Sequence, residues 1–405
     1  MDSLRNTFIA MPDSLSTIVI GAPATGIKFW PRKDVTNALK EAIGNDHIIF
    51  PGPRRTGKTS ILLALRANFP QPGRAVFVNA EKYSSPTELI QGIAKEVATP
   101  DLKKRAGKFL KAGASKIKGI KLGLFGVDFN QAAEADWAQA AEGLLQALIE
   151  EKSQVLIMID EFSVFISNLA KRTPDDAEKL LRWFREWRQR LVDTKVRFLL
   201  TGSIGIDTVL RQLKLGDTIN DCRSIEMSPP PPAAARDFLK ARARENEVPV
   251  TDELVTEMLR LIDPHWHYPL QIFLAEIKDW ARRNERAPGV ADLGVIYTNE
   301  LVRKGNENLK HMWDKLTEIF NAADARFAQA LLKDMSKSSA GFSRAEMEAI
   351  HLREFPSDTQ VARADFSFVL NVLHHDGYLI QESQGAQRTR FASNLLRDYW
   401  SRQHA

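Results

Sequence analysis

Runs of apolar residues that end in polar or small side chains recur along the first half of the chain. Uninterrupted runs of this kind are typical of parallel strands that helices bury on both faces. They predict strands that begin at His47 and that cover Val76–Asn79, Val155–Ile159 and Arg197–Leu200. A capping box with proline at the first helical position starts a helix after Ser85. Strands that alternate with helices predict right-handed crossovers and a three-layer α/β fold with a parallel sheet.

The second half of the chain changes to purely helical patterns. The proline run 229–232 ends the α/β part, because neither a helix nor a central strand passes through four prolines. Helical periodicity is then predicted near 233–246, 251–262, 269–285, 290–303, 310–334, 343–352 and 362–375. A β-hairpin is predicted around 383–386, and three helices followed by a hairpin is the order of a winged-helix domain.

A chain of 405 residues is long for a single hydrophobic core, so we expect several domains. The patterns divide it into an α/β domain at 1–228, a helical domain at 229–302 and a winged-helix domain at 303–405. A basic insertion at about 101–130 interrupts the first of these.

Composition restricts the cellular setting. The single cysteine, Cys222, excludes an internal disulfide and fits a reducing compartment. The chain has no apolar run long enough to span a membrane, and its N-terminus does not have the form of a secretory signal. We therefore expect a cytoplasmic protein. The net charge of +5 permits binding to nucleic acid or to an acidic partner without requiring it.

The strand that begins at His47 leads into a glycine-bounded loop and the start of a helix. The loop reads Gly52-x4-Gly57-Lys58-Thr59, a phosphate-binding pattern in its proper strand–loop–helix context. Backbone N–H groups of such a loop and the positive end of the helix bind a polyphosphate. We expect Lys58 to neutralise the β- and γ-phosphates and Thr59 to ligate Mg²⁺. The alternative is a glycine-rich turn with solvated basic residues. The expected binding residues are Gly52, Pro53, Arg54, Arg55, Thr56, Gly57, Lys58, Thr59 and Ser60.

Two later strands end in side chains suited to hydrolysis. Asp160 can hold Mg²⁺ at the carboxyl end of its strand, and Glu161 can orient or deprotonate the water that attacks the γ-phosphate. The next strand ends in Thr201-Gly-Ser203, where either hydroxyl could sense the γ-phosphate or hold that water. The alternatives are solvated acids in the first case and a simple strand-to-turn transition in the second.

Together these motifs resemble the STAND-type P-loop ATPases of the AAA+ lineage, in particular archaeal-type ATPases related to origin-recognition ATPases. The resemblance extends over nearly the whole chain and is most specific at the phosphate loop, with its double arginine, and at the acidic pair. It implies an α/β P-loop NTPase core followed by an all-helical lid and a C-terminal winged-helix domain. It also implies ATP as the bound nucleotide, together with Mg²⁺.

The matches around the base are weaker. Phe29-Trp-Pro-Arg32 is similar to a hydrophobic-Gly-Arg-Glu motif, which implies that Arg32 lies near the base. His267-Tyr-Pro269 stands where the family has Gly-x-Pro, a lid turn over adenine, so Pro269 is implied to contact the nucleotide. Pro31 and His267 both replace family glycines. The resemblance also raises a role for Arg223 on the phosphate of a neighbouring subunit, with a surface arginine as the alternative.

Two features point towards partners. The segment Lys103–Lys121 carries eight basic residues and no acid, so it could bind DNA or an acidic protein, or form a solvated amphipathic helix beside a small hairpin. The expected recognition helix of the winged-helix domain balances Arg363 with Asp365 and presents Phe368 and Val372, which favours packing on protein over reading a groove.

These observations lead to one main hypothesis and two alternatives. The main hypothesis is a slowly hydrolysing switch ATPase that couples its nucleotide state to lid and winged-helix rearrangement and to the binding of a protein partner. The lid turn carries no arginine, which argues against an unfolding motor. The alternatives are a DNA-associated ATPase similar to origin-recognition or transposition-regulator proteins, and an oligomerising signalling ATPase in phage defence. The second alternative predicts a nucleotide-dependent homo-oligomer.

Overall fold

A computed structural model describes residues 17–113, 137–202, 205–303, 309, 312–314, 316–317, 320–356, 364–381 and 388–404. Its first part is built on a five-stranded parallel sheet with the strand order β2-β3-β4-β1-β5. The strands are β1 (His47–Phe50), β2 (Arg74–Asn79), β3 (Val155–Asp160), β4 (Val196–Thr201) and β5 (Cys222–Ser224). The edge strand β5 was not predicted, because three residues with a polar majority carry no apolar run.

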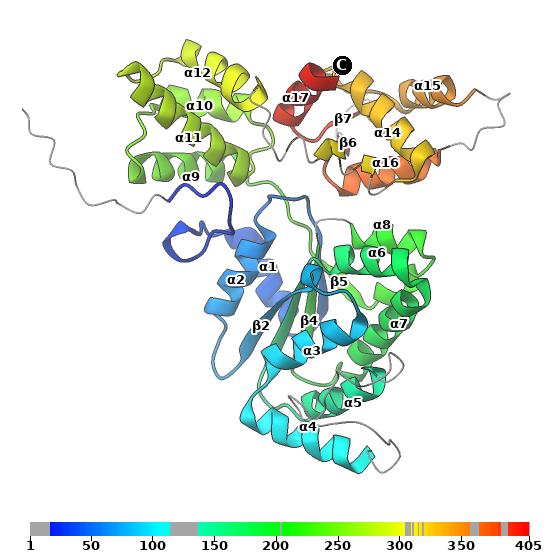
Figure 1. Cartoon of the computed structure of the whole chain (residues 1–405). Coiled ribbons are helices and arrows are strands. Elements are labelled where there is room, and N and C mark those ends of the chain that lie inside the picture. Colours follow the sequence, from blue (N-terminus) through cyan, green and yellow to red (C-terminus); the bar gives the residue numbers. More distant parts are fainter. Residues whose placement is uncertain are drawn as a thin grey trace, which may run out of the picture.

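Helices cover both faces of this sheet and form three layers (Figure 1). One face carries α1 (Lys33–Ile43) and α2 (Lys58–Ala67); the other carries α3 (Pro86–Val97), α5 (Trp137–Ile149), α6 (Phe162–Arg172), α7 (Pro174–Arg190) and α8 (Ile206–Gln212). Strand β3 shows why its sequence is apolar without interruption. Leu156 and Met158 enter the first core, while Ile157 and Ile159 enter the second, and all four are fully buried.

Helix α4 (Pro100–Gly113) holds the first part of the predicted basic insertion. It lies beside α5 at the end of the α/β domain that is remote from the lid and the winged helix (Figure 1). Lys103 and Lys104 are exposed on α4, whereas Arg105 forms ion pairs with Asp101 and Glu151. The predicted strand at 122–129 lies outside the described residues.

A helical lid follows the proline run. It contains α9 (Pro232–Glu245), α10 (Asp252–Leu261), α11 (His267–Asn284), α12 (Val290–Ile296) and the π-helix η7 (Tyr297–Arg303). These elements share a hydrophobic core of their own. Helix α11 begins two residues earlier than predicted, so Pro269 lies within its first turn, where proline's missing N–H costs nothing.

The C-terminal part has the order of a winged helix, as predicted. It consists of α14 (Ala322–Met335), α15 (Arg344–Glu354), α16 (Phe366–His375), the antiparallel hairpin β6 (Leu379–Gln381) and β7 (Thr389–Phe391), and α17 (Asn394–His404). The fold class predicted from the sequence is therefore confirmed.

Two predicted details of this domain are wrong. The continuous helix predicted at 310–334 is interrupted, because the Asn321 side chain accepts a hydrogen bond from the Asp324 N–H and starts α14 anew. Val372 is completely buried in the core of the domain, not exposed on α16.

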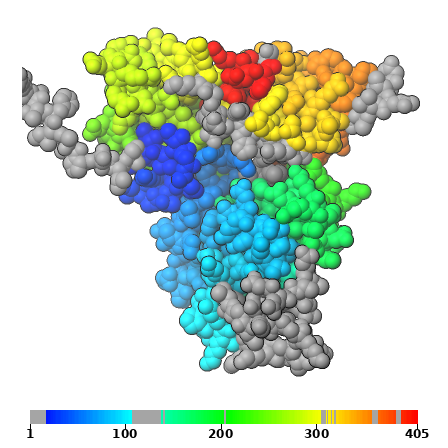
Figure 2. All heavy atoms as spheres, viewed as in Figure 1, coloured from blue at the N-terminus to red at the C-terminus, as the bar shows by residue number. Residues whose placement is uncertain are grey.

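Helix α17 joins the lid to the winged helix. Leu395 belongs to the core of the lid, whereas Leu396 and Trp400 belong to the core of the winged helix. The Tyr297 hydroxyl of the lid donates to Asp398 at 2.8 Å. Figure 2 shows α17, in red, between the two parts above the α/β domain. Helix α17 therefore stabilises both C-terminal parts. The domain boundaries at 228/229 and 302/303 stay predictions.

Candidate functional site

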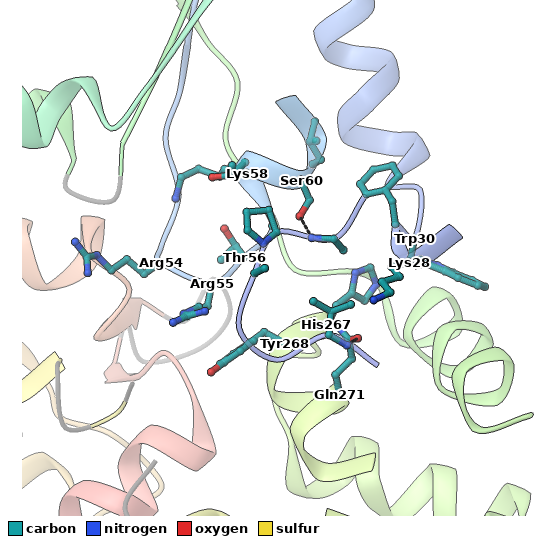
Figure 3. A pocket seen from close by; sticks show the side chains of 18 of the residues that line it. Lys28, Trp30, Arg54, Arg55, Thr56, Lys58, Ser60, His267, Tyr268 and Gln271 are labelled. Carbon is teal, nitrogen blue, oxygen red and sulfur yellow. Dashed lines mark hydrogen bonds between the residues drawn. The ribbon is translucent and has the colours of Figure 1, made fainter. Parts of the chain in front are cut away.

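A cavity of about 330 Å³ opens at the carboxyl edge of the sheet. Three segments that are far apart in the sequence form its walls: the phosphate loop and first turn of α2, residues 19–32, and the start of α11 (Figure 3). This is the position at which ligands bind in parallel α/β sheets. The volume lies in the range of sites for small molecules and nucleotides.

The phosphate loop depends on glycine at both ends. Gly52 has φ 154° and Gly57 has φ 100°, and Gly57 is the N-cap residue of α2. A Cβ on Gly52 would lie 2.6 Å from the Met227 Cβ, so a side chain has no room there. The loop consequently turns into α2 with the first N–H groups of the helix at the cavity, where they favour an anion.

Lys58 folds back on the loop. Its Nζ donates to the carbonyl oxygens of Gly52 at 2.5 Å and of Pro53 at 2.8 Å, and the side chain is buried. The Thr56 hydroxyl donates to the same Pro53 carbonyl. An ammonium held by two carbonyl oxygens can exchange them for phosphate oxygens, which carry more negative charge.

Thr59 and Asp160 meet beside the loop. The Thr59 hydroxyl donates to Asp160 Oδ2 at 2.7 Å. Burial raises the pKa of Asp160 above its usual value, while the Thr59 hydrogen bond and the Lys58 charge act in the opposite direction. Both predicted Mg²⁺ ligands are hard oxygen donors and stand together, which fits an ion that usually takes one or two protein oxygens and completes its shell with phosphate and water.

Glu161 follows at the end of β3 and lines the cavity. It adopts a left-handed backbone conformation with φ 54° and is the N-cap residue of α6. This conformation is uncommon for a residue other than glycine, and such outliers concentrate at functional sites. If bound, Mg²⁺ would neutralise charge on phosphate oxygens, and Glu161 would face the same cavity as a base.

Other predicted residues are placed differently. The Thr201 hydroxyl donates to the Phe50 carbonyl at 2.8 Å, and neither Thr201 nor Pro269 lines the cavity. Ser203 lies outside the described residues. Arg32 does line the cavity and is buried. Arg223 is half-exposed on β5, where it pairs with Asp46. The roles assigned to these residues stay predictions.

Sequence reasoning missed the segment 17–28, which covers the cavity. Its backbone is held at Val19 by Gln271 of the lid and at Ala24 by Ser60 of α2. Arg55 donates to the Gly21 carbonyl and lies 5.1 Å from the ring centre of Tyr268. The segment has no helical or strand periodicity, so no local signal marks it.

The winged helix also reaches the phosphate loop, at the turn that follows α16. A Cβ on Gly377, which has φ 76°, would lie 2.5 Å from Cγ of Pro53. Asp376 is buried and accepts a hydrogen bond from the Gly205 N–H at 3.2 Å. The turn after α16 is thus in direct contact with both the phosphate loop and the segment that follows β4.

Comparison with known proteins agrees with this geometry. Residues 43–210 match the AAA domain family. The match covers β1 to β4 and includes the phosphate loop and the acidic pair. No curated protein matches the sequence significantly.

Two solved structures are similar to this chain over most of its length. The ORC2 protein of Aeropyrum pernix, in a structure with ADPNP and ADP, is 15% identical with a TM-score of 0.52, over 91% of this chain and 90% of that one. The ORC1 protein of Aeropyrum pernix in complex with DNA is 15% identical with a TM-score of 0.41, over 93% of both chains. At this identity the first similarity shows the fold alone, and the lower score of the second carries no further argument. Within the described residues, no helix is long and apolar enough to cross a membrane.

Proposed function

We propose that this chain is a switch ATPase of the STAND type. It binds ATP with Mg²⁺, hydrolyses it slowly, and couples its nucleotide state to a rearrangement of the lid and winged helix that changes the binding of a protein partner. A cytoplasmic location stays part of this proposal.

The contact between the winged helix and the phosphate loop carries the proposal. Gly377 lies against Pro53, and Asp376 holds the Gly205 N–H beyond β4. A phosphate group that enters the loop changes the positions of its backbone and of the Pro53 ring attached to it, and the winged helix rests on that ring. A ligand that favours one arrangement of this contact shifts the position of the whole domain.

The geometry of the site supports the following hydrolytic roles. Lys58 exchanges its carbonyl partners for phosphate oxygens, and Thr59 and Asp160 hold Mg²⁺. Glu161 orients the attacking water or accepts its proton. In our proposal Thr201 contributes only after its hydroxyl leaves the Phe50 carbonyl, which makes it a candidate for sensing the γ-phosphate.

The first experiment measures nucleotide binding. Purified protein and the Lys58→Ala variant are titrated with ATP by calorimetry, with and without Mg²⁺, and their ATPase rates are compared. We expect Mg²⁺-dependent binding by the wild type and at least a ~100-fold weaker affinity in Lys58→Ala, because charged hydrogen bonds to phosphate are lost. Normal binding and hydrolysis by Lys58→Ala would refute the assignment. A rapid ATPase rate in the absence of any partner would refute the switch function.

The second experiment measures the rearrangement. Lys179 on α7 and Ala349 on α15 are exposed and suit dye attachment through introduced cysteines in a Cys222→Ser background. We expect energy transfer between the dyes to differ between ATP and ADP. Equal transfer in both states, with nucleotide binding intact, would exclude the coupling. Light scattering in the same states reports nucleotide-dependent homo-oligomers, which the phage-defence alternative requires.

One observation favours the DNA-associated alternative. Lys103 and Lys104 are exposed on α4, in the basic segment. Arg105 is unsuited to the test because its ion pair with Glu151 and its hydrogen bond to the Ala147 carbonyl hold α4 to the end of α5. The alternative predicts salt-dependent DNA binding that a Lys103→Glu, Lys104→Glu double variant weakens at least ~10-fold. Binding by the winged helix itself would need the C-terminal end of α16 to leave the α/β domain.

A further inference from the structure

The cavity wall on the side of the lid is aromatic. The His267 ring lies with its centre 4.1 Å from that of Phe238 at an interplanar angle of 31°, and Trp30 meets Phe238 edge-on at 5.6 Å. Figure 3 shows His267 and Trp30 on the side of the cavity away from Lys58. A flat, apolar heterocycle fits such a wall, whereas the triphosphate belongs at the loop.

Two groups outside the cavity wall fix the Arg32 guanidinium in position. Its Nε and Nη2 donate to the Asp34 carboxylate, and Nη2 also donates to the Ser228 carbonyl at 2.7 Å. The remaining nitrogen, Nη1, is buried and has no hydrogen-bond partner among the described residues. Since the guanidinium is planar and held on two sides, this donor has a set direction.

His267 carries the second such atom. Its Nε2 is buried and has no hydrogen-bond partner in the described part of the chain. Burial lowers the pKa of His267 to about 3, with the Arg32 and Arg242 charges acting in the same direction and Asp34 against them. The ring is therefore neutral at physiological pH, and its Nε2 can accept a hydrogen bond while Nδ1 carries the proton.

A buried donor and a buried acceptor beside one cavity are both costly until a ligand pairs with them. We propose that Arg32 and His267 select adenine by its Watson–Crick edge: Arg32 Nη1 donates to N1, and His267 Nε2 accepts from the 6-amino group. This rests on the proposed function, because it assigns the base of the same nucleotide. Guanine presents N1–H to Arg32, so donor would face donor, and its 6-oxo group could pair with His267 only if the ring proton moved to Nε2.

The test combines one variant with altered bases. His267→Phe keeps a ring on Phe238 and removes Nε2, and its melting temperature is measured first to show that it folds. Affinities for ATP, GTP and purine riboside triphosphate, which lacks the 6-amino group, are measured for both proteins. We expect the wild type to prefer ATP over GTP by at least ~100-fold. We expect His267→Phe to lose ~10-fold for ATP and nothing for the analogue without the amino group.

Three results separate the hypotheses. Base selection would be overturned if His267→Phe kept its ATP affinity, or if it lost equal affinity for ATP and for the analogue. The phosphate site would still be supported in that case by the loss of binding in Lys58→Ala. Absence of nucleotide binding by the wild type would overturn the proposed function itself. An ATP affinity that varies with pH between 5.5 and 8 in the wild type but not in His267→Phe would show that His267 titrates there, which contradicts the neutral acceptor.

Discussion

Replacing Gly377 by alanine tests the contact between the winged helix and the phosphate loop. The new Cβ would lie 2.5 Å from Cγ and 2.7 Å from Cβ of Pro53. Ordinary contact between carbon atoms is about 3.5 Å or more, so the two segments must separate by about 1 Å. The winged helix is expected to move away from the α/β domain, because the phosphate loop is held by its own glycines and by α2.

The magnitude follows from the neighbouring hydrogen bond. The Gly205 N–H donates to Asp376 at 3.2 Å, and a further 1 Å breaks it. Hydrogen bonds to charged groups contribute about 2 kcal/mol, so the open arrangement gains roughly 30-fold in population. The φ of 76° at Gly377 adds a separate cost of about 1 kcal/mol for alanine. That cost lowers the stability of the closed and the open arrangement equally, so it does not change the ratio of their populations.

Gly216→Ala is the matched control. Gly216 begins a short 3-10 helix after α8, outside the residues that line the cavity, and a Cβ there meets no atom of the described residues within 4 Å. The assay is the release rate of a fluorescent ATP analogue, together with energy transfer between the domains. We expect Gly377→Ala to release nucleotide roughly 30-fold faster than Gly216→Ala, in line with the change in population. Equal rates and equal transfer in the two variants would refute the reasoning.

Three further outcomes are expected. Glu161→Gln should retain ATP affinity and lose at least ~100-fold in hydrolysis, measured by phosphate release, because it removes a base and no phosphate ligand; an unchanged rate would exclude Glu161 as the base. Burial lowers the pKa of His47 to about 4 from 6.5, so its contribution to stability is present above pH 6.5 and is lost as the pH falls towards 4, by at most about 3 kcal/mol. Denaturant unfolding at pH 7 and pH 5 should therefore show a smaller difference in the free energy of unfolding for His47→Gln than for the wild type. An equal difference in the two proteins would contradict this. Gly341→Ala, with φ 67° and a Cβ against the Thr389 carbonyl, should destabilise the winged helix by about 3 kcal/mol, seen as a lower melting temperature with nucleotide affinity retained.

The phosphate loop shows what local sequence predicts well. Gly52 to Thr59 are consecutive residues between a strand and a helix, so their spacing alone specifies a loop around an anion. Asp160 and Glu161 are equally local, because they end a fully buried strand. Boundaries were less accurate: the restart of α14 depends on the Asn321 cap, and β5 depends on pairing with β1.

The far wall of the cavity shows what local sequence does not predict. Arg32 was implied near the base by resemblance only, and His267 was recognised only as a departure from a family glycine. Their buried atoms lack a hydrogen-bond partner among the described residues. They lie together because the start of α1 and the start of α11, more than 200 residues apart, meet at one cavity. The segment 17–28 covers that cavity through hydrogen bonds to α2 and the lid, which no periodicity encodes.

The sequence by itself predicted the phosphate loop, because that motif needs only neighbouring residues in one strand–loop–helix unit. It also determined the order of α/β, helical and winged-helix parts, because apolar periodicity is a local property. Only the tertiary structure decided that Gly377 rests on Pro53 and that Arg32 and His267 face one cavity. These contacts join residues that lie hundreds of positions apart, and the packing of whole domains brings them together.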